Sequence, residues 1–204
     1  MDPVRAYRDD GPLTTMLARG LAPLRHHALA LGLLGAVAIG LATAFIDESS
    51  DVLPVFAAAV FVLLAAPGAG PGAGSMPGRL AWLLPPLIRL GEYGFVLGLA
   101  VHGGSQTLPA VYGLLAAVAF HHYDIVYRLR HQRVQPPRWI TSLGGGWDGR
   151  MLLVGLFFAG GVLANGATVL AAWCGALFVL ESIASWMRFN HLRSPAVSPS
   201  CRVP

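Results

Sequence analysis

The sequence of 204 residues contains no lysine, only two cysteines and few charged residues of any kind. Its charged fraction is 12% and its hydrophobic fraction is 55%, which excludes an ordinary soluble globular domain. Cys174 falls in a predicted membrane segment and Cys201 in the C-terminal tail, so neither a disulfide nor a shared metal site is expected. The mean hydropathy of +0.60 predicts an integral membrane protein.

The missing lysine also bears on the glycine- and proline-rich segment 67–79, PGAGPGAGSMPGR. A glycine-rich loop that cradles phosphate follows a strand and is followed by a lysine, and this segment has neither. We therefore interpret 67–79 as a flexible loop between helices.

All 14 basic residues are arginine. Guanidinium groups favour bidentate contacts with phosphate, which is one interpretation of this bias. A GC-rich genome that favours arginine codons is the other, and both stay open.

The apolar runs predict an all-α polytopic membrane protein with six transmembrane helices. The predicted spans are residues 28–46, 52–66, 80–102, 108–127 and two within 151–187. The third span is expected to be broken near Pro85 and Pro86, so that residues 90–102 cross the membrane, and the last region is divided at Asn165–Gly166. Residues 13–27 predict an amphipathic helix at the membrane surface. The domain organisation expected is a tail and interfacial helix at 1–27, a six-helix domain at 28–188 with a basic loop at 128–150, and a tail at 189–204.

The orientation follows from where the arginines fall in this scheme. Every arginine lies in the N-terminal segment, between spans two and three, after span four, or in the C-terminal tail. These four regions share one side of the membrane, which the positive-inside rule makes cytoplasmic. We therefore expect a multi-pass protein of the cell membrane with both termini in the cytoplasm.

The segment 114–130, LLAAVAFHHYDIVYRLR, carries the clearest functional signal, because an apolar span ends there in ionisable residues. On a helix His121, Asp124 and Arg128 lie along one face, with Tyr127 beside them. Ionisable side chains at the edge of a bilayer are costly unless they meet partners or a ligand. This stripe is therefore a candidate functional site.

Other charged pairs are expected at a similar depth. Glu181 and Arg188 share a face of span six, and Glu92, Asp148 and Arg150 approach from other helices. A polar pocket open to the cytoplasm would satisfy these groups together. An interhelical ion-pair network that only fixes packing would also do so.

Such a pocket suggests chemistry on phosphate groups. The catalytic residues expected are His121, His122 and Asp124, with one of the two histidines as the base, and the metal ligands for Mg²⁺ or Mn²⁺ are Asp124 and Asp148. Arg128, Arg130 and Arg150 are expected to clamp the phosphate. The supporting polar cluster consists of Glu92, Tyr127, Glu181 and Arg188.

Two known families offer a comparison. The CDP-alcohol phosphatidyltransferases have six membrane helices and a cytoplasmic metal site, but only the fragment Asp148-Gly149-Arg150 of their DxxDGxxAR signature is present, so their mechanism is not carried over. FHHYDIVYRLR (120–130), PPRW (136–139) and GGGWDGR (144–150) resemble an uncharacterised actinobacterial membrane domain found beside or fused to those enzymes. That resemblance implies a context in phospholipid or head-group metabolism and a CDP-alcohol phosphotransferase as a partner.

Three classes of function remain open at this point. The chain is a membrane enzyme acting on a lipid-linked phosphate or CDP-alcohol, a noncatalytic accessory subunit of such an enzyme, or a small transporter. The partners expected are membrane lipids and no nucleic acid. The glycine and alanine content of the spans also permits close packing between two copies of the chain.

Overall fold

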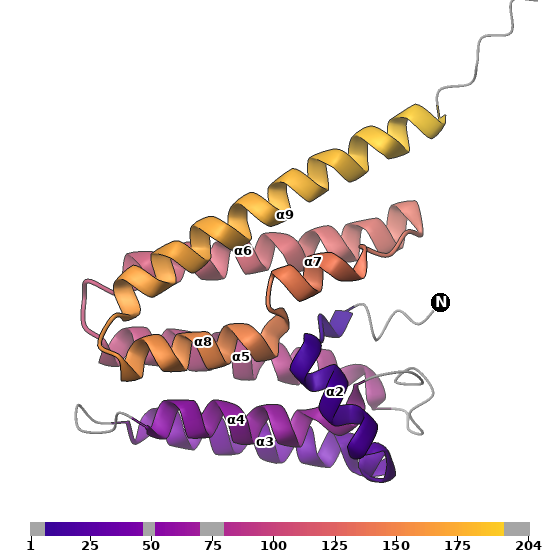
Figure 1. Ribbon diagram of the computed structural model, residues 1–204. Coiled ribbons are helices and arrows are strands. Elements are labelled where there is room, and N and C mark those ends of the chain that lie inside the picture. The colour runs from indigo at the N-terminus through magenta and orange to yellow at the C-terminus, as the bar shows by residue number, and fades with distance from the viewer. Residues whose placement is uncertain (1–6, 47–51, 70–79, 194–204) are drawn as a thin grey trace, which may run out of the picture.

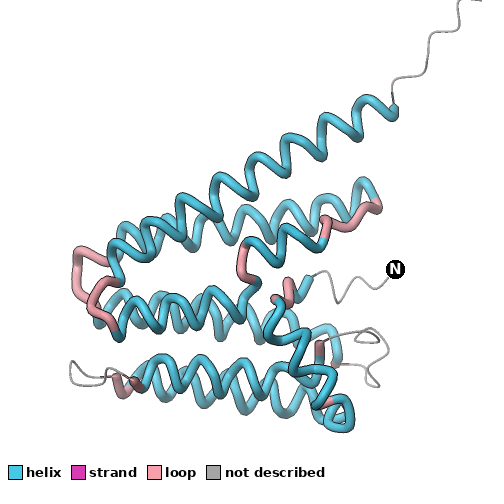
Figure 2. Tube along the Cα trace, viewed as in Figure 1, coloured by secondary structure: helices cyan, strands magenta, loops and turns pink. Residues whose placement is uncertain are grey.

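The computed structural model describes residues 7–46, 52–69 and 80–193, and all of its regular structure there is helical (Figures 1 and 2). The elements in chain order are α2 (Pro12–Gly20), η1 (Ala22–His27), α3 (Ala28–Ala44), α4 (Leu53–Ala65), η2 (Ala66–Gly68), η4 (Ala81–Leu83), α5 (Leu84–His102), α6 (Leu108–Tyr127), the π-helical turn η5 (Arg128–Gln132), α7 (Arg138–Leu143), α8 (Gly146–Ala159) and α9 (Leu163–Arg193).

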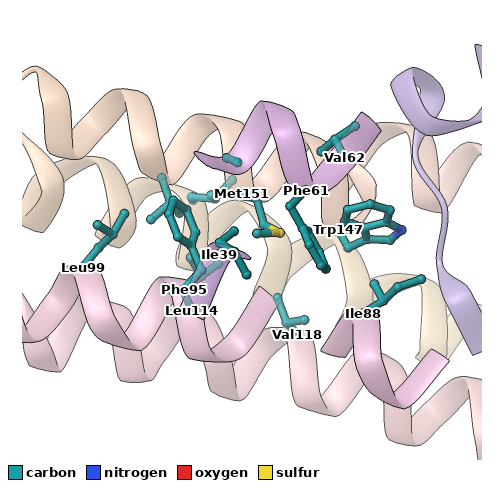
Figure 3. Packing of buried hydrophobic residues seen from close by; sticks show 14 of the residues in the cluster. Ile39, Phe61, Val62, Ile88, Phe95, Leu99, Leu114, Val118, Trp147 and Met151 are labelled. Atoms are coloured by element: carbon teal, nitrogen blue, oxygen red, sulfur yellow. The ribbon is translucent and has the colours of Figure 1, made fainter. Parts of the chain in front are cut away.

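Six long helices pack in pairs. The α6 and α9 helices contact each other along their length, as do α3 and α4, while α5 and α8 lie between these two pairs (Figure 1). The central core is aromatic: the ring of Phe61 on α4 meets Trp147 on α8 edge-on, with centroids 5.4 Å apart. Met151, Phe95 and Leu114 continue this core toward α5 and α6 (Figure 3). Trp147 is fully buried and so links the middle pair to α4.

Three of the helical stretches are long and apolar enough to cross a membrane, which indicates a membrane protein. They are Ala22–Ala44, Leu84–His102 and Leu163–His191 among the described residues. Each of the six segments predicted as spans contains one long helix, but α4 has 13 residues and α8 has 14. At a rise of ~1.5 Å per residue these two helices are shorter than a ~30 Å hydrocarbon core.

Two predicted boundaries are wrong. The break in the last apolar region lies at Gly160–Gly161 and not at Asn165–Gly166, which is inside α9. Gly161 has φ +65°, a backbone conformation that glycine adopts without strain. The third segment does change near Pro85 and Pro86, where the 3-10 turn η4 ends at Leu83, but its crossing part begins at Leu84 and not at residue 90. Both prolines lie in the first turn of α5, where no intrahelical N–H bond is lost.

The N-terminal region also differs from the free tail that its charges suggest. Arg8 and Asp9 are 0% and 3% exposed, and α2 crosses the ends of α3, α4 and α8 (Figure 1). The loop predicted at 67–79 begins with three buried residues, 67–69, and the C-terminal tail predicted at 189–204 begins as part of α9. The acidic loop 47–51 and the rest of these two segments lie outside the described residues.

Candidate functional site

One group of ionisable residues joins α6 to α9, and we call Asp124, Arg128, Glu181 and Ser182 the α6–α9 cluster. The Arg128 guanidinium donates to both carboxylate oxygens of Glu181, at 2.8 and 2.5 Å, and also pairs with Asp124 one turn earlier. Ser182 Oγ donates to Asp124 Oδ1 at 3.1 Å. All four side chains are buried, so the predicted stripe is largely satisfied by the protein itself.

The outer edge of this cluster is open to solvent. Arg188 is exposed, and its Nη2 lies 3.8 Å from Glu181 Oε1. Tyr127 does not join the ion pairs: its ring packs at a tilt against the rings of His131 and Trp186, with centroids 4.5 and 5.5 Å away. These contacts make Tyr127 part of an aromatic group at the end of the α6–α9 pair.

A second group, which we call the N-terminal cluster, consists of Asp9, Arg89, Glu92 and Arg150. Arg150 Nε donates to Glu92 Oε1 at 2.7 Å and its Nη2 donates to Asp9 Oδ2 at 3.0 Å. Arg89 Nη1 donates to the other oxygen of Glu92 at 2.6 Å. Arg89 Nη2 reaches the backbone carbonyls of residues 7 and 8 at 3.1 and 2.6 Å. The cluster thus ties the N-terminal segment to α5 and α8.

Asp148 lies at the start of α8 but bonds to the start of α2. Its Oδ1 accepts from the Gly11 N–H and its Oδ2 from the Thr14 N–H, both at 2.8 Å. These are donors that a helix N-terminus leaves without intrahelical partners. Asp148 therefore caps α2 from another helix, a role that α2's own sequence does not provide.

Arg8 and Asp10 complete the packing of this segment. Arg8 Nε donates to Asp10 at 2.8 Å and its Nη2 to the carbonyl of Ala65 at 3.2 Å. Trp147 Nε1 donates to Asp10 Oδ1 at 3.0 Å. Residues 8–10 are thereby held by the core tryptophan as well as by the ion pairs.

The two histidines of α6 face Asp9. His121 Nε2 lies 3.5 Å from Asp9 Oδ1, and His122 Nε2 lies 3.5 Å from Asp9 Oδ2. Tyr93 Oη is hydrogen-bonded to His122 Nδ1 at 2.8 Å. Asp9 Oδ1 and both Nε2 atoms are buried and have no hydrogen-bond partner among the described residues. These buried atoms therefore face one another between α6 and the N-terminal segment at the outer limit of hydrogen-bond distance.

Asp9 is held in an unusual state. Its φ is +51°, in the left-handed region, which few non-glycine residues occupy and which aspartate tolerates better than most. Burial opposes ionisation of the carboxyl group, but Arg150 and the neighbouring His121 and His122 outweigh it and hold the pKa of Asp9 well below its ordinary value. Asp9 is thus ionised at neutral pH.

Two cavities border this part of the molecule. The first, which we call the α5–α6 cavity, has a volume of about 440 Å³ and lies against α5, α6 and η5. Its lining residues are Tyr7, Trp82, Pro85, Pro86, Arg89, His122, Ile125, Val126 and Arg130. The second, the α2–α7 cavity, has a volume of about 350 Å³ and lies between the N-terminal segment and α7. It is lined by Asp9, Asp10, Gly11, Pro12, Thr15, Met16, Ile125, Gln135, Pro136, Arg138, Thr141 and Ser142.

The three arginines predicted as a phosphate clamp do not share one site. Arg128 and Arg150 are each 1% exposed and already hold carboxylates. Arg130 is exposed, lines the α5–α6 cavity and forms no ion pair with any described residue. Of the three, Arg130 is the one available to an anion.

The predicted metal ligands also have separate surroundings. Asp124 is bound by Arg128 and Ser182, and Asp148 by two backbone N–H groups. In the part of the chain that the structure describes, no three His, Cys, Asp or Glu side chains gather as a metal ion would require. Binding of Mg²⁺ or Mn²⁺ stays a prediction.

The most important residue that sequence reasoning missed is Asp9. It lies 141 positions from Arg150 and in a charged segment that is typical of a solvated tail. Arg8 and Asp10 were overlooked for the same reason. The one available signal was the arginine at position 8 followed directly by two aspartates and, two residues later, by Pro12. That pattern by itself predicts no burial.

Comparison with known proteins gives one result. Neither a curated protein nor a solved structure matches the chain. The model of one family matches residues 2–201, which is nearly the whole sequence. The chain therefore belongs to DUF5941, a family of unknown function.

Proposed function

We propose that this protein binds a phosphorylated lipid, or a lipid-linked CDP-alcohol, in the α5–α6 cavity and acts on its head group by transfer or hydrolysis. The single observation that carries the proposal is the composition of that cavity. Trp82, Pro85, Pro86 and Val126 form an apolar wall, while Arg130 brings a cation that forms no ion pair within the described part of the chain. An acyl chain suits such a wall, and a phosphate suits the guanidinium.

The proposal includes the topology expected from the sequence. All six long helices cross the membrane, and α2, α7 and the N-terminal cluster face the cytoplasm. In support, the turns 103–107 and 160–162 lie at one end of the bundle, whereas α2 and α7 lie at the other (Figure 1). Every arginine with a described side chain belongs to the α2 end. Tilt and local thinning of the bilayer would accommodate α4 and α8.

His122 is the group best placed to move a proton in this cavity. It lines the cavity, its Nδ1 bonds to Tyr93 Oη, and its Nε2 faces the carboxylate of Asp9. A carboxylate beside an imidazole stabilises the imidazolium that forms when the ring accepts a proton from an attacking hydroxyl or water. In this reading the His122 imidazole is the general base: Asp9 positions its Nε2–H, Nδ1 accepts the proton through the Tyr93 hydroxyl that is bonded to it, and Arg130 binds the phosphate.

Binding is tested first on protein reconstituted in nanodiscs. Native mass spectrometry compares retention of phosphatidic acid with that of phosphatidylcholine in the wild type, in Arg130→Gln and in Arg138→Gln. Arg138 is an exposed arginine of the other cavity and serves as the matched control. We expect a preference for phosphatidic acid that Arg130→Gln reduces about tenfold and Arg138→Gln leaves intact. Equal losses in both variants would show only nonspecific attraction of anionic lipid.

Turnover is tested separately. The same protein is incubated with phosphatidic acid, and release of inorganic phosphate is measured; CDP-diacylglycerol with an alcohol tests for transfer. We expect His122→Gln to abolish product formation while lipid retention is unchanged. Retention without turnover in the wild type under all of these conditions would reject the catalytic part of the proposal.

A specific observation favours a second function, that of an accessory subunit. All three arginines of the two clusters already meet carboxylates, whereas Arg130, Arg133 and Arg138 stay exposed between α6 and α8. This basic surface suits an acidic partner, such as a CDP-alcohol phosphotransferase, or an anionic lipid surface. Under this alternative, co-purification of the transferase would survive His122→Gln and would be lost when Arg133 and Arg138 are both replaced by Gln.

A further inference from the structure

Phe178 on α9 and His121 on α6 form a stacked pair next to the Asp9 carboxylate. Their ring centroids lie 3.9 Å apart with 11° between the planes, and the two residues are 1% and 3% exposed. We propose that this pair positions Asp9, so that one carboxylate oxygen stays on His122. The inference rests on the proposed function, because it gives the general base of that site two further positioning residues.

The two oxygens of the Asp9 carboxylate have different neighbours. Arg150 Nη2 donates to Oδ2 at 3.0 Å, and His122 Nε2 lies 3.5 Å from that same oxygen. Oδ1 faces His121 Nε2 at 3.5 Å and has no closer donor among the described residues. Because the Asp9 side chain is 0% exposed, water does not take this place. The N–H of His121 is therefore the group that restrains Oδ1.

Phe178 determines which way the His121 ring points. In a closely packed interior, a ring that lies flat against another cannot rotate without pushing its neighbour away. Phe178 is itself closely packed, since a Cβ on Gly144 would lie 2.9 Å from two atoms of its ring. The His121 ring therefore keeps its Nε2 toward Asp9.

Loss of the His121 N–H would change the orientation of the Asp9 carboxylate. Oδ1 would be buried without any donor, which is costly. Arg150 offers one, because its Nη1 donates only over a long 3.4 Å to the carbonyl of Gly144. A carboxylate that turns to accept from both ends of the guanidinium gains the bidentate geometry that arginine favours, and Oδ2 then leaves His122. His121 thus keeps Asp9 on His122.

The tautomer of His122 reports on this positioning. With the Asp9 carboxylate at Nε2, the ring carries its proton there, and Nδ1 accepts from the Tyr93 hydroxyl. When the carboxylate turns away, the ring can instead carry the proton on Nδ1 and donate it to Tyr93 Oη. The measurement is ¹⁵N NMR of the full-length protein in nanodiscs with labelled histidine. His122→Gln identifies the His122 signals among those of the seven histidines.

Two substitutions of His121 separate its N–H from its ring. His121→Phe keeps a ring on Phe178 but has no donor, whereas His121→Gln loses the ring and keeps an amide N–H. We expect His121→Phe to convert much of His122 to the Nδ1–H tautomer and His121→Gln to retain most of the Nε2–H form. In phosphate release from phosphatidic acid, kcat should fall about 10- to 100-fold in His121→Phe while lipid retention is unchanged. His131→Phe, at an exposed histidine of η5, is the matched control and should change neither readout.

Phe178→Leu tests the stack and should shift the His122 tautomer in the same direction, by less. Thermal unfolding shows which variants are folded, and Phe178→Leu decides if His121→Phe is not. An unchanged His122 tautomer in the folded variants overturns the proposal. So does a larger effect of His121→Gln than of His121→Phe, because ring packing alone would then explain the role of His121.

The tautomer is measured without turnover, so this proposal and the proposed function fail separately. A tautomer change in His121→Phe supports the positioning role even if the wild type releases no phosphate, a result that rejects the proposed reaction alone. Normal turnover with an unchanged tautomer overturns the positioning role and leaves the proposed function standing.

Discussion

Arg128, the first residue of η5 directly after α6, binds both carboxylate oxygens of Glu181 on α9, with N–O distances of 2.8 and 2.5 Å and side chains that are 1% and 3% exposed. The α6 and α9 helices belong to widely separated parts of the chain, and this ion pair fixes their register. A bidentate pair of this kind is shape-specific as well as charged.

Replacement of Glu181 by Gln should destabilise the protein substantially, because it leaves the buried Arg128 guanidinium with Asp124 alone. Breaking one side of a buried pair costs about 3–5 kcal/mol. Thermal unfolding in detergent is the measurement, and Arg188→Gln is the control, since Arg188 is 66% exposed and water screens its 3.8 Å contact with Glu181. Similar small shifts in both variants would mean that the pair does not contribute to stability.

Substitution of Gly11 by Ala should release α2 from the bundle. A Cβ at Gly11 would lie 2.1 Å from Asp148 Oδ1 and 2.6 Å from the carbonyl oxygen of Gly145, which cannot move freely. Limited proteolysis within residues 12–20 should become faster. Gly20→Ala is the matched control in the same helix, because a Cβ there meets nothing within 4 Å and the change favours helix. Equal protection of both variants would contradict the close packing of Gly11.

The low pKa of Asp9 predicts an acid-sensitive part of the stability. Because the folded-state pKa lies below the unfolded value of ~3.9, ionised Asp9 stabilises the fold above that pH, and this contribution is lost as pH falls through the folded pKa. Asp9→Asn should therefore lower Tm at pH 7 and show a smaller further loss of Tm below pH 4 than the wild type. Parallel curves for the two proteins would show that Asp9 does not contribute to the acid sensitivity.

Trp147 offers a way to separate ring packing from hydrogen bonding. Trp147→Ala removes a fully buried ring and should cost about 3–5 kcal/mol. Trp147→Phe keeps most of the contact with Phe61 but removes the N–H that binds Asp10, so we expect about 1–2 kcal/mol. Chemical denaturation in detergent measures both. If the Phe variant is as unstable as the Ala variant, the bond to Asp10 matters more than the ring.

The sequence was informative where a signal is local. Apolar runs located the six long helices, because a membrane-length helix needs such a run. Spacing on one helix also placed Asp124 and Arg128 on a shared face, and they pair. The partner of Arg128 on α9 was expected only as a residue of similar depth. The way the side-chain ridges of α6 and α9 pack into each other's grooves decides which carboxylate Arg128 meets. The periodicity of the sequence does not specify this packing.

The predicted helix boundaries are wrong where several helix-breaking residues lie close together in the sequence. Gly160–Gly161 and Asn165–Gly166 both could end a helix in the last apolar region. The packing of α8 and α9 determines that the turn forms at the first pair, where Gly161 adopts a left-handed conformation. The burial of Asp9 could not be predicted at all, because it depends on Arg150 and on two histidines in other helices. A charged segment near a terminus is more often solvated than buried.

The anchoring of residues 8–11 has a consequence for biosynthesis. These residues are translated early, whereas their partners Trp147, Asp148 and Arg150 are made more than a hundred residues later. The N-terminal segment must therefore wait, unpaired, until α8 has been translated and inserted. Completion of the site between α6 and the N-terminal segment is then a late step of assembly, and a chain that stops before α8 carries the histidines of α6 without the arginine that holds Asp9 against them.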